Sequence, residues 1–364
     1  MILKKLMPLS LINIATACLT LIWVPILISV VGAESYGKFI LIVTISSIIY
    51  SIIYINNWQW LLIKLEENKK NSVYVSIAND ILYFLCILTI IFIIKSTAFI
   101  SLSDEYKRLL CSYLIGFSIS IQSIYVAYFR SINKFNTAAL VVFFSELLKS
   151  SLIIFACYYY DSDKEIIGFL SGFIWIFGLP HIVLSFYSVI KLRDFIDLNG
   201  FFENFRNFIN YNIYLHPKNI SDLVINHFDK VIIKINLGYE ALAVYDILKK
   251  IGYSISKLLS PIYPIVFREL VKIANDNEAL RIYAGKTTKV LILISIGIYL
   301  SVEFLYFFRS LFINESHLLN KVIFYSGEAR LYIICHLLGF SACVIHLILS
   351  ALSETKKEFI ITFI

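Results

Sequence analysis

Long apolar runs separated by short polar or charged breaks follow one another along the whole chain. A bilayer core of about 30 Å needs about 20 apolar residues per crossing helix, and the runs have this length. A further apolar run, from Phe359 to the final Ile364, predicts an additional span that is cut short. The pattern predicts ten complete membrane-spanning helices, near residues 6–31, 36–62, 72–94, 109–129, 137–159, 166–190, 211–236, 241–267, 287–308 and 330–352.

Composition strengthens this interpretation. Of the 364 residues, 59% are hydrophobic and 16% are charged, and the mean hydropathy is +0.80. Soluble domains average about 45–50% apolar and about 25% charged residues. A water-soluble fold is therefore excluded, and the polar breaks leave no room for a sizeable soluble domain. The six cysteines show no CxxC spacing, so we interpret them as apolar side chains and not as a disulfide framework.

The net charge of +7 reflects orientation in the membrane and not a nucleic-acid partner, because Lys and Arg lie in short loops instead of on one amphipathic face. With a cytoplasmic N-terminus, the loops on that side hold 17 basic residues and the opposite loops hold 8. Cytoplasmic loops are enriched in Lys and Arg, so this difference predicts that the N-terminus is inside. Seven further lysines lie within predicted spans: Lys149, Lys218, Lys230, Lys234, Lys249, Lys250 and Lys257.

A short segment occurs twice. Residues 32–39 align without gaps to residues 238–245, an offset of 206, and share Gly, Glu, a small residue and an aromatic residue in the same places. Both copies connect one predicted span to the next on the outer side, so they predict two parallel halves of six spans each. A tight turn that arose twice by chance is the alternative. The expected organisation is an N-terminal six-helix lobe (1–190), a cytoplasmic linker (191–208) and an incomplete C-terminal lobe (209–364) of about four spans plus the start of a fifth.

Ionisable and polar residues within spans five, seven and eight are the candidate site. A charge inside a bilayer costs several kcal/mol, so such residues usually face a polar cavity or a partner. On spans seven and eight they recur at spacings of three and four, which places them on one face of a helix. We interpret them as the lining of a central hydrated cavity with surplus positive charge, which suits an anionic head group because lysine meets phosphate as a point charge. The alternative is that they snorkel to the interface or pair as packing contacts. The predicted residues are Glu146, Lys149, Asp222, Asn226, Asp229, Lys230, Asp246, Lys249, Lys250 and Lys257.

Catalytic and cofactor motifs are weak. Gly285-Lys286-Thr287 matches the end of a phosphate-binding loop, but Leu280 stands where GxxxxGKT needs its first glycine, so we predict no ATP site. The six histidines show neither HExxH nor a paired i, i+4 spacing, and there is no GxSxG elbow. We therefore expect no metal, no cofactor and no enzymatic activity. Pro261 and Pro264 predict a bend at the inner end of the eighth span.

Two segments carry a family resemblance. Residues 32–37 (Gly-Ala-Glu-Ser-Tyr-Gly), after a first span that begins with basic residues, resemble the polysaccharide-export branch of the multidrug/oligosaccharidyl-lipid/polysaccharide exporter superfamily. Residues 226–233, then Leu237-Gly238-Tyr239-Glu240, Tyr245 and the Pro264 region, resemble the seventh and eighth spans of that family, although Ala243 stands in the second turn where the first has Gly37.

The resemblance implies a MATE-like, all-α fold of two six-helix lobes around a cationic cavity and a flippase of the Wzx type that works by alternating access. Its substrate would be undecaprenyl-pyrophosphate-linked O-antigen or polysaccharide repeat units, and it would be located in the bacterial inner membrane. It also implies ion coupling in some members, by H⁺ or Na⁺. Expected partners are the lipid-linked oligosaccharide, membrane lipid, and the polysaccharide polymerase and chain-length machinery.

Three other functions are weighed against a flippase. A drug or cation antiporter of the same fold would favour an acidic cavity, whereas lysine is in excess in spans five, seven and eight. A membrane O-antigen polymerase or ligase would show a long periplasmic loop with basic catalytic residues, and the largest predicted outer loop, Arg309 to Arg330, is modest. A scaffold without transport would keep seven basic residues within its spans at a cost that nothing offsets.

Overall fold

The computed structural model describes residues 2–55, 57–67, 72–96, 103–120, 123–193, 201–259, 262–274, 276–307, 334 and 347–352. Within these residues the structure is helical and contains no strand, which confirms the all-α prediction. Most of the predicted tenth span, the start of the eleventh, and residues 194–200 of the predicted linker lie outside the described residues. The elements are α1 (Ile2–Ile53), α2 (Trp58–Glu66), α3 (Ser72–Ser96), α4 (Asp104–Ile119), α5 (Ser123–Ser131), α6 (Phe135–Tyr159), α7 (Asp163–Phe173), the 3₁₀ helix η1 (Ile174–Gly178), α8 (Leu179–Lys191), α9 (Phe201–Leu259), α10 (Ile262–Ile273) and α11 (Asn277–Phe307).

The helices of the first half are long and apolar enough to cross a membrane. Five stretches of the described residues meet this condition: Pro8–Ile53, Ser72–Ser96, Asp104–Ser131, Phe135–Tyr159 and Asp163–Lys191. The first of them is interrupted at Gly32, so the five stretches correspond to the six spans predicted for this half. The chain is a polytopic membrane protein.

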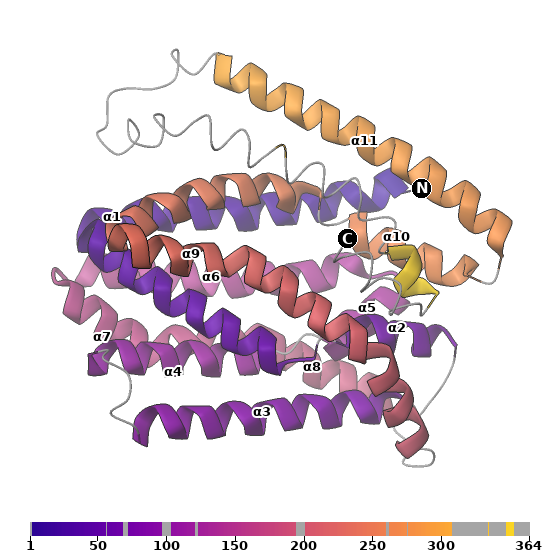
Figure 1. Ribbon diagram of the computed structural model, residues 1–364, viewed down its shortest axis with the longest axis horizontal. Helices are drawn as coiled ribbons and strands as arrows, with labels where there is room; N and C mark the ends of the chain where they lie inside the picture. Colours follow the sequence, from indigo (N-terminus) through magenta and orange to yellow (C-terminus); the bar gives the residue numbers. More distant parts are fainter. Residues whose placement is uncertain are drawn as a thin grey trace.

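Two glycines break the two longest helices. In α1, Gly32 has φ 81° and ψ 165°, and in α9, Gly238 has φ 85° and ψ −174°. This region of backbone space is accessible essentially only to glycine. At each glycine the chain turns back, and in Figure 1 the two arms of α1 and of α9 fold back at the same end of the molecule. We call this end, where Gly32 and Gly238 lie, the turn end, and the opposite end, where α2 and α10 lie, the α10 end. Gly32 and Gly238, the first residues of the two aligned segments 32–39 and 238–245, adopt the same conformation, which confirms the predicted repeat at this position.

The repeat extends beyond these turns. The helical arm after Gly32 ends at Ile53, and the arm after Gly238 is described as far as Leu259. Each arm is followed by a short helix, α2 or α10, and then by a long one, α3 or α11. The series α1–α3 and the series α9–α11 are therefore equivalent, as two parallel repeats require. The lobe boundaries at residues 190 and 209 stay predictions.

The second span was predicted as the continuous segment 36–62, and this was wrong. After Ile53 the chain leaves the helix, and the side chain of Asn79 on α3 donates a hydrogen bond of 3.1 Å to the carbonyl of Ile55. That bond satisfies a backbone acceptor that the broken helix leaves open. The eighth span was predicted as the continuous segment 241–267. The described part of α9 reaches Leu259 and α10 begins at Ile262, and residues 260 and 261 between them lie outside the described residues. The bend predicted from Pro261 and Pro264 stays a prediction.

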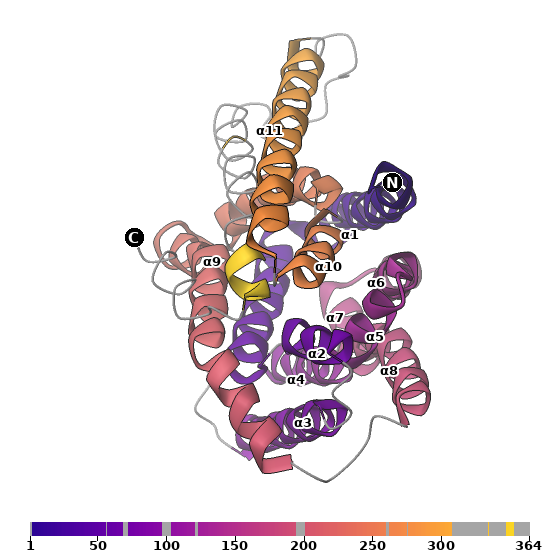
Figure 2. The same cartoon turned by 90° about the vertical axis from the view of Figure 1, so that its right-hand side faces the viewer.

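The two halves contact each other at both ends of the molecule. At the turn end a hydrophobic cluster combines Tyr36, Phe39 and Tyr113 of the first half with Leu242 and Ala243 of the second. At the α10 end a second cluster combines aliphatic and aromatic residues of both halves, among them Trp60, Leu62, Phe208, Tyr211, Phe267 and Leu270. Figures 1 and 2 show α9 running beside α1, with α6 on the other side of α1.

Candidate functional site

A buried carboxylate lies where the two arms of α9 meet. Asp246 is fully buried, and its Oδ1 lies 2.6 Å from Lys230 Nζ while its Oδ2 lies 2.6 Å from Lys250 Nζ. Lys250 stands one turn after Asp246 on the same arm, and Lys230 stands on the other arm, as far before Gly238 as Asp246 is after it. The turn at Gly238 therefore pairs these two positions. A buried charge is tolerated only when it is paired and hydrogen-bonded, and Asp246 meets both conditions.

Tyr36 brings the first half to this carboxylate. Its hydroxyl donates a hydrogen bond of 2.7 Å to Oδ2 of Asp246, and it accepts one of 2.7 Å from Lys250 Nζ. Tyr36 is fully buried on the arm of α1 that follows the Gly32 turn. The contact joins a residue of the first turn motif to a residue just after the second one, so the repeat itself places the two groups together.

A second ion pair lies beside the first. Asp229, which precedes Lys230, pairs with Lys249 and accepts a hydrogen bond from the Tyr245 hydroxyl. The Lys249 ammonium also lies 5.7 Å from the centre of the Tyr245 ring. Lys249 and Lys250, which follow the Gly238 turn, are therefore each held by a carboxylate.

Helix α6 contributes a third carboxylate. Oε1 of Glu146 accepts hydrogen bonds from the Thr20 hydroxyl (3.0 Å) and from Nε1 of Trp23 (3.3 Å), both on the first arm of α1. Its Oε2 lies 2.5 Å from Lys149 Nζ, one turn along α6. A polar contact of this kind fixes the face that α6 presents to α1.

Trp23 connects the groups of α6 to those of α9. The Lys250 ammonium lies 4.8 Å from the centre of the Trp23 ring, and the Lys149 ammonium lies 5.9 Å from it. Ammonium groups at this distance are attracted by the negative face of an indole ring. Thr20, Trp23, Tyr36 and the charged residues of α6 and α9 therefore form one polar network, which we call the interlobe network.

Seven of the ten predicted site residues belong to the interlobe network: Glu146, Lys149, Asp229, Lys230, Asp246, Lys249 and Lys250. The other three, Asp222, Asn226 and Lys257, lie on the backbone of α9, but their side chains are outside the described part of the structure. Four lysines face three carboxylates in the network, so one positive charge is in excess. That these residues line a substrate cavity stays a prediction.

Sequence reasoning did not assign Trp23, Tyr36 or Tyr245 to the site. Tyr36 belongs to the first turn motif, and the offset of 206 residues could have placed it beside the residues after Gly238. No pattern in the sequence marks Trp23, because a tryptophan in an apolar run is usually a packing residue.

A different polar contact joins the halves at the α10 end. The buried side chain of Arg268 on α10 binds Glu66 of α2 through Nε at 3.0 Å, donates to the carbonyl of Ser131 at 2.6 Å, and donates to the side chain of Asn133. Asn133 has φ 62°, a left-handed conformation that Asn tolerates better than most residues. The sequence assigned Arg268 only to a loop whose charge sets the orientation, and the structure gives it three partners on two segments of the first half, α2 and the end of α5.

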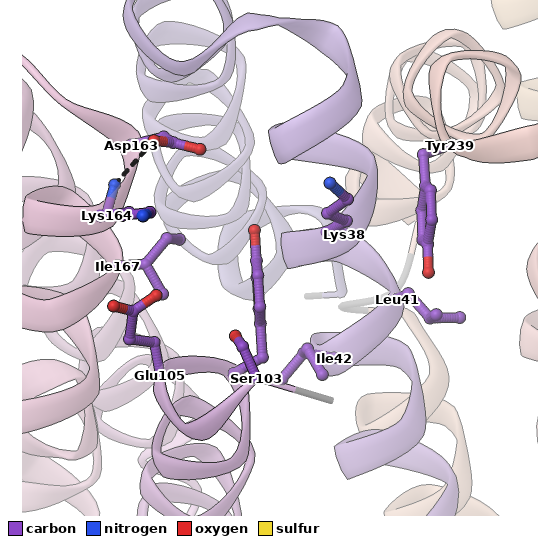
Figure 3. A pocket seen from close by; sticks show the side chains of 10 residues that line it. Lys38, Leu41, Ile42, Ser103, Glu105, Asp163, Lys164, Ile167 and Tyr239 are labelled. Carbon is purple, nitrogen blue, oxygen red and sulfur yellow. Dashed lines mark hydrogen bonds between the residues drawn. The ribbon is translucent and has the colours of Figure 1, made fainter. Parts of the chain in front are cut away.

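A pocket of about 360 Å³ lies at the turn end, away from the interlobe network. Figure 3 shows Lys38 and Tyr239 across this pocket from Asp163 and Lys164. None of the described residues that line the pocket is one of the ten predicted site residues. Asp163 is held in place by a hydrogen bond of 3.0 Å from the Ser35 hydroxyl, and Lys38 pairs with Glu34 at 2.8 Å. Within the described residues, no group of three or more His, Cys, Asp and Glu side chains could hold a metal ion.

Comparison with protein families gives one match. The family described as "Polysaccharide biosynthesis protein" matches residues 2–267, which include both turn motifs and all of the interlobe network. A search of curated protein sequences returned no match.

Several solved structures share the fold. The outward-facing conformation of a multidrug resistance MATE family transporter of the MOP superfamily superposes with a TM-score of 0.71 at 15% identity, covering 99% of this chain and 84% of that one. A MOP superfamily transporter from Pyrococcus furiosus, described as having a binding pocket of reverse polarity, gives 0.68 at 14% identity with coverages of 99% and 84%. A mutant of the Vibrio cholerae MATE transporter VcmN gives 0.59 at 11% identity with coverages of 99% and 85%. At identities this low the superpositions show a common fold of two helical lobes, and they do not show which substrate this chain binds.

Proposed function

Because the chain belongs to the family of polysaccharide biosynthesis proteins and has the fold of MOP superfamily transporters, we propose that it flips a lipid-linked saccharide across a membrane. The proposed cargo is an undecaprenyl-pyrophosphate-linked O-antigen or polysaccharide repeat unit, and the membrane is the bacterial inner membrane. The proposed mechanism is alternating access, in which the two lobes rock about the interlobe network. Family and fold are those of transporters, so we propose no enzymatic step.

The observation that carries this proposal is the interlobe network with its four lysines. Lys230, Lys249 and Lys250 are each held by a carboxylate of α9, and Lys149 by Glu146 of α6. A pyrophosphate offers several strong acceptor oxygens, so it is able to replace a carboxylate as the partner of a lysine. The lysines of the network are therefore able to bind an anionic head group. When no head group is bound, the carboxylates compensate most of their charge, so the network is stable within the membrane.

Binding at this place would act on the contact between the lobes. Lys250 belongs to the second half, while Tyr36 and Trp23, which it contacts, belong to the first. A head group that draws Lys250 away weakens the polar contact that joins the halves. A ligand shifts a conformational equilibrium only through such a difference in contacts between the two states. The lipid tail would remain in the bilayer beside the network.

The experiment is complementation of a strain that lacks the gene. In that strain we expect complete lipid-linked repeat units to accumulate on the cytoplasmic face and surface polysaccharide to be lost, and the wild-type gene to restore export. A variant in which the four lysines of the network, Lys149, Lys230, Lys249 and Lys250, are all changed to Gln should not restore it. Lys272→Gln, an exposed residue of α10, is the matched control and should restore export. Full complementation by the fourfold variant contradicts the role of the lysines.

The same strain distinguishes the enzyme alternative. A polymerase or ligase defect would let single repeat units reach the outer face without being joined, whereas a flippase defect keeps them inside. Single units at the surface of the deletion strain would therefore overturn the flippase proposal in favour of a polymerase.

A drug or cation antiporter is the second candidate, because the solved structures that share the fold include multidrug transporters. Three carboxylates in the interlobe network would serve such a function. Deletion should then raise sensitivity to cationic drugs and leave polysaccharide export intact. A coupling ion, H⁺ or Na⁺, would be identified by imposing each gradient on proteoliposomes that contain the full chain.

A further inference from the structure

The pocket at the turn end combines several kinds of group that bind a carbohydrate. Glu105 and Asp163 provide acceptor oxygens, and Lys38 and Lys164 provide donor ammonium groups. Tyr106 adds an aromatic ring, whose face packs against the C–H groups of a sugar. The volume of about 360 Å³ falls within the range of about 300–1,000 Å³ that is usual for small-ligand sites.

This pocket lacks the excess of positive charge that the interlobe network has. Two carboxylates and two ammonium groups line it, and the Lys38 ammonium is also paired with Glu34 outside the lining, so the pocket offers both donors and acceptors of hydrogen bonds. Sugar hydroxyls both donate and accept hydrogen bonds, and therefore suit such a lining. The remaining wall is apolar and comes from Leu41, Ile42 and Ile167, which is the environment that the less polar face of a pyranose needs.

Both halves of the molecule build the pocket. Tyr239, directly after the Gly238 turn, is its lining residue from the second half, and the other lining residues belong to α1, to α7, to α4 and to Ser103 just before α4. Figure 3 shows Tyr239 as the wall beside Lys38, opposite Asp163 and Lys164. The pocket has this lining only when the two halves touch at the turn end.

The contact that closes the pocket depends on Gly37. A Cβ atom placed on Gly37 would lie 2.1 Å from the carbonyl oxygen of Tyr239 and 2.7 Å from its carbonyl carbon. Both are backbone atoms, so they cannot move aside as a flexible side chain would. Any larger residue at position 37 therefore pushes Tyr239, and with it the second turn, away from the first half.

We propose that the turn-end pocket binds one pyranose ring of a saccharide, and that it does so in the state in which Gly37 and Tyr239 are in contact. This inference rests on the proposed function for its ligand class and adds a second site that takes the sugar, apart from the network that takes the pyrophosphate. Because Tyr239 moves with the second half, sugar binding and closure of the turn end favour each other. The ring comes either from the lipid-linked cargo or from a free saccharide at the outer surface.

The test is a binding measurement on the full chain in nanodiscs. Methyl glycosides of glucose, of N-acetylglucosamine and of galacturonic acid are titrated at millimolar concentration and followed by saturation-transfer difference NMR. We expect at least one of them to bind, and Tyr106→Ala and Glu105→Gln each to weaken it about tenfold, which is the loss of a stacking contact or of a charged hydrogen bond. Gly37→Ala should weaken it as well, although its side chain would not touch the sugar.

Two control variants keep these losses interpretable. Tyr158→Ala removes a tyrosine that is 81% exposed at the turn end of α6, and Arg108→Gln removes an exposed charge on α4, the helix that carries Tyr106. Neither residue lines the pocket, so both variants should bind the glycoside as the wild type does. Equal binding by the pocket variants and the wild type would overturn the proposal, as would an equal loss in the controls.

The source of the sugar is decided by a second titration with the lipid-linked saccharide and with undecaprenyl phosphate alone. If only the lipid-linked saccharide binds and Tyr106→Ala weakens it, the ring is that of the cargo; if the methyl glycosides bind as well, a free saccharide suffices. No binding of either, or full competition by undecaprenyl phosphate alone, refutes a sugar site.

Flipping by the wild type in vesicles is measured separately. If the wild type flips the lipid-linked saccharide and the pocket variants bind glycosides normally, the sugar site is refuted and the proposed function stands. If glycosides bind to the pocket and the wild type does not flip, the proposed function is refuted and the sugar site stands.

Discussion

Replacing Gly238 by alanine tests the conformation on which the repeat depends. Gly238 has φ 85° and ψ −174°, and a Cβ atom placed on it would meet nothing within 4 Å. The substitution therefore adds no steric contact with other residues. Its effect comes only from forcing a residue with a side chain into a backbone region that is essentially restricted to glycine.

The size of this effect follows from a comparison with a second glycine. Gly168 lies in the helical conformation on α7, and a Cβ atom there would also meet nothing within 4 Å. Both substitutions reduce the conformational entropy of the unfolded chain by a similar amount, which by itself stabilises by about 0.4–1 kcal/mol. That contribution cancels when the two variants are compared. The difference that remains is the backbone strain at Gly238, about 1–3 kcal/mol.

The measurement is the free energy of unfolding of the full chain in mixed micelles, titrated with a denaturing detergent. We expect Gly168→Ala to be at least as stable as the wild type and Gly238→Ala to be less stable than Gly168→Ala by about 1–3 kcal/mol. Gly32→Ala, at the equivalent turn with φ 81°, should behave like Gly238→Ala. Equal stability of Gly238→Ala and Gly168→Ala would refute the assignment of a glycine-only turn at this position.

Two further predictions concern buried ionic contacts, and a third concerns the orientation of the chain in the membrane. Asp246→Asn leaves two half-buried lysines without their carboxylate and should lower the free energy of unfolding by about 3 kcal/mol, and adding Lys230→Gln should recover part of that loss in a double-mutant cycle. Arg268→Lys should destabilise nearly as much as Arg268→Ala, because a single ammonium cannot reproduce the planar donors that reach three partners, and a lysine variant as stable as the wild type would contradict this. Cysteines introduced at Arg281 and at Asp161, in a chain without its native cysteines, should be labelled by a membrane-impermeant reagent from the cytoplasmic and from the outer side respectively, and the reverse pattern would invert the topology.

Much of the fold follows from short-range patterns. Apolar runs of about 20 residues predict helical spans, because a helix of this length crosses the bilayer and satisfies its own backbone hydrogen bonds in lipid. The aligned turns predict a repeat because only glycine adopts the conformation that both turns need, and Gly32 and Gly238 have it. The break after Ile53 was harder to foresee, because a side chain of another helix, Asn79 of α3, supports it.

The candidate site was only partly predictable for a related reason. Helical spacing puts charged residues on one face and identifies Asp246 and Lys250 as neighbours, but it does not say which helix this face meets. Tyr36 and Trp23 reach these residues from α1, across the boundary between the halves. The Arg268 contact at the α10 end is of the same kind, since its partners lie on segments far away in the sequence.

The sequence by itself determined that this chain is a helical membrane protein of two repeated halves with ionisable residues concentrated in spans five, seven and eight. Those properties depend on local composition and on spacing along single helices, which the chain carries without reference to its neighbours. The tertiary structure alone decided how the charges pair, that α1 and α9 close on each other through Gly37 and Tyr239, and that a pocket forms beside this contact. These depend on which faces of distant helices meet, and packing between the two halves sets that.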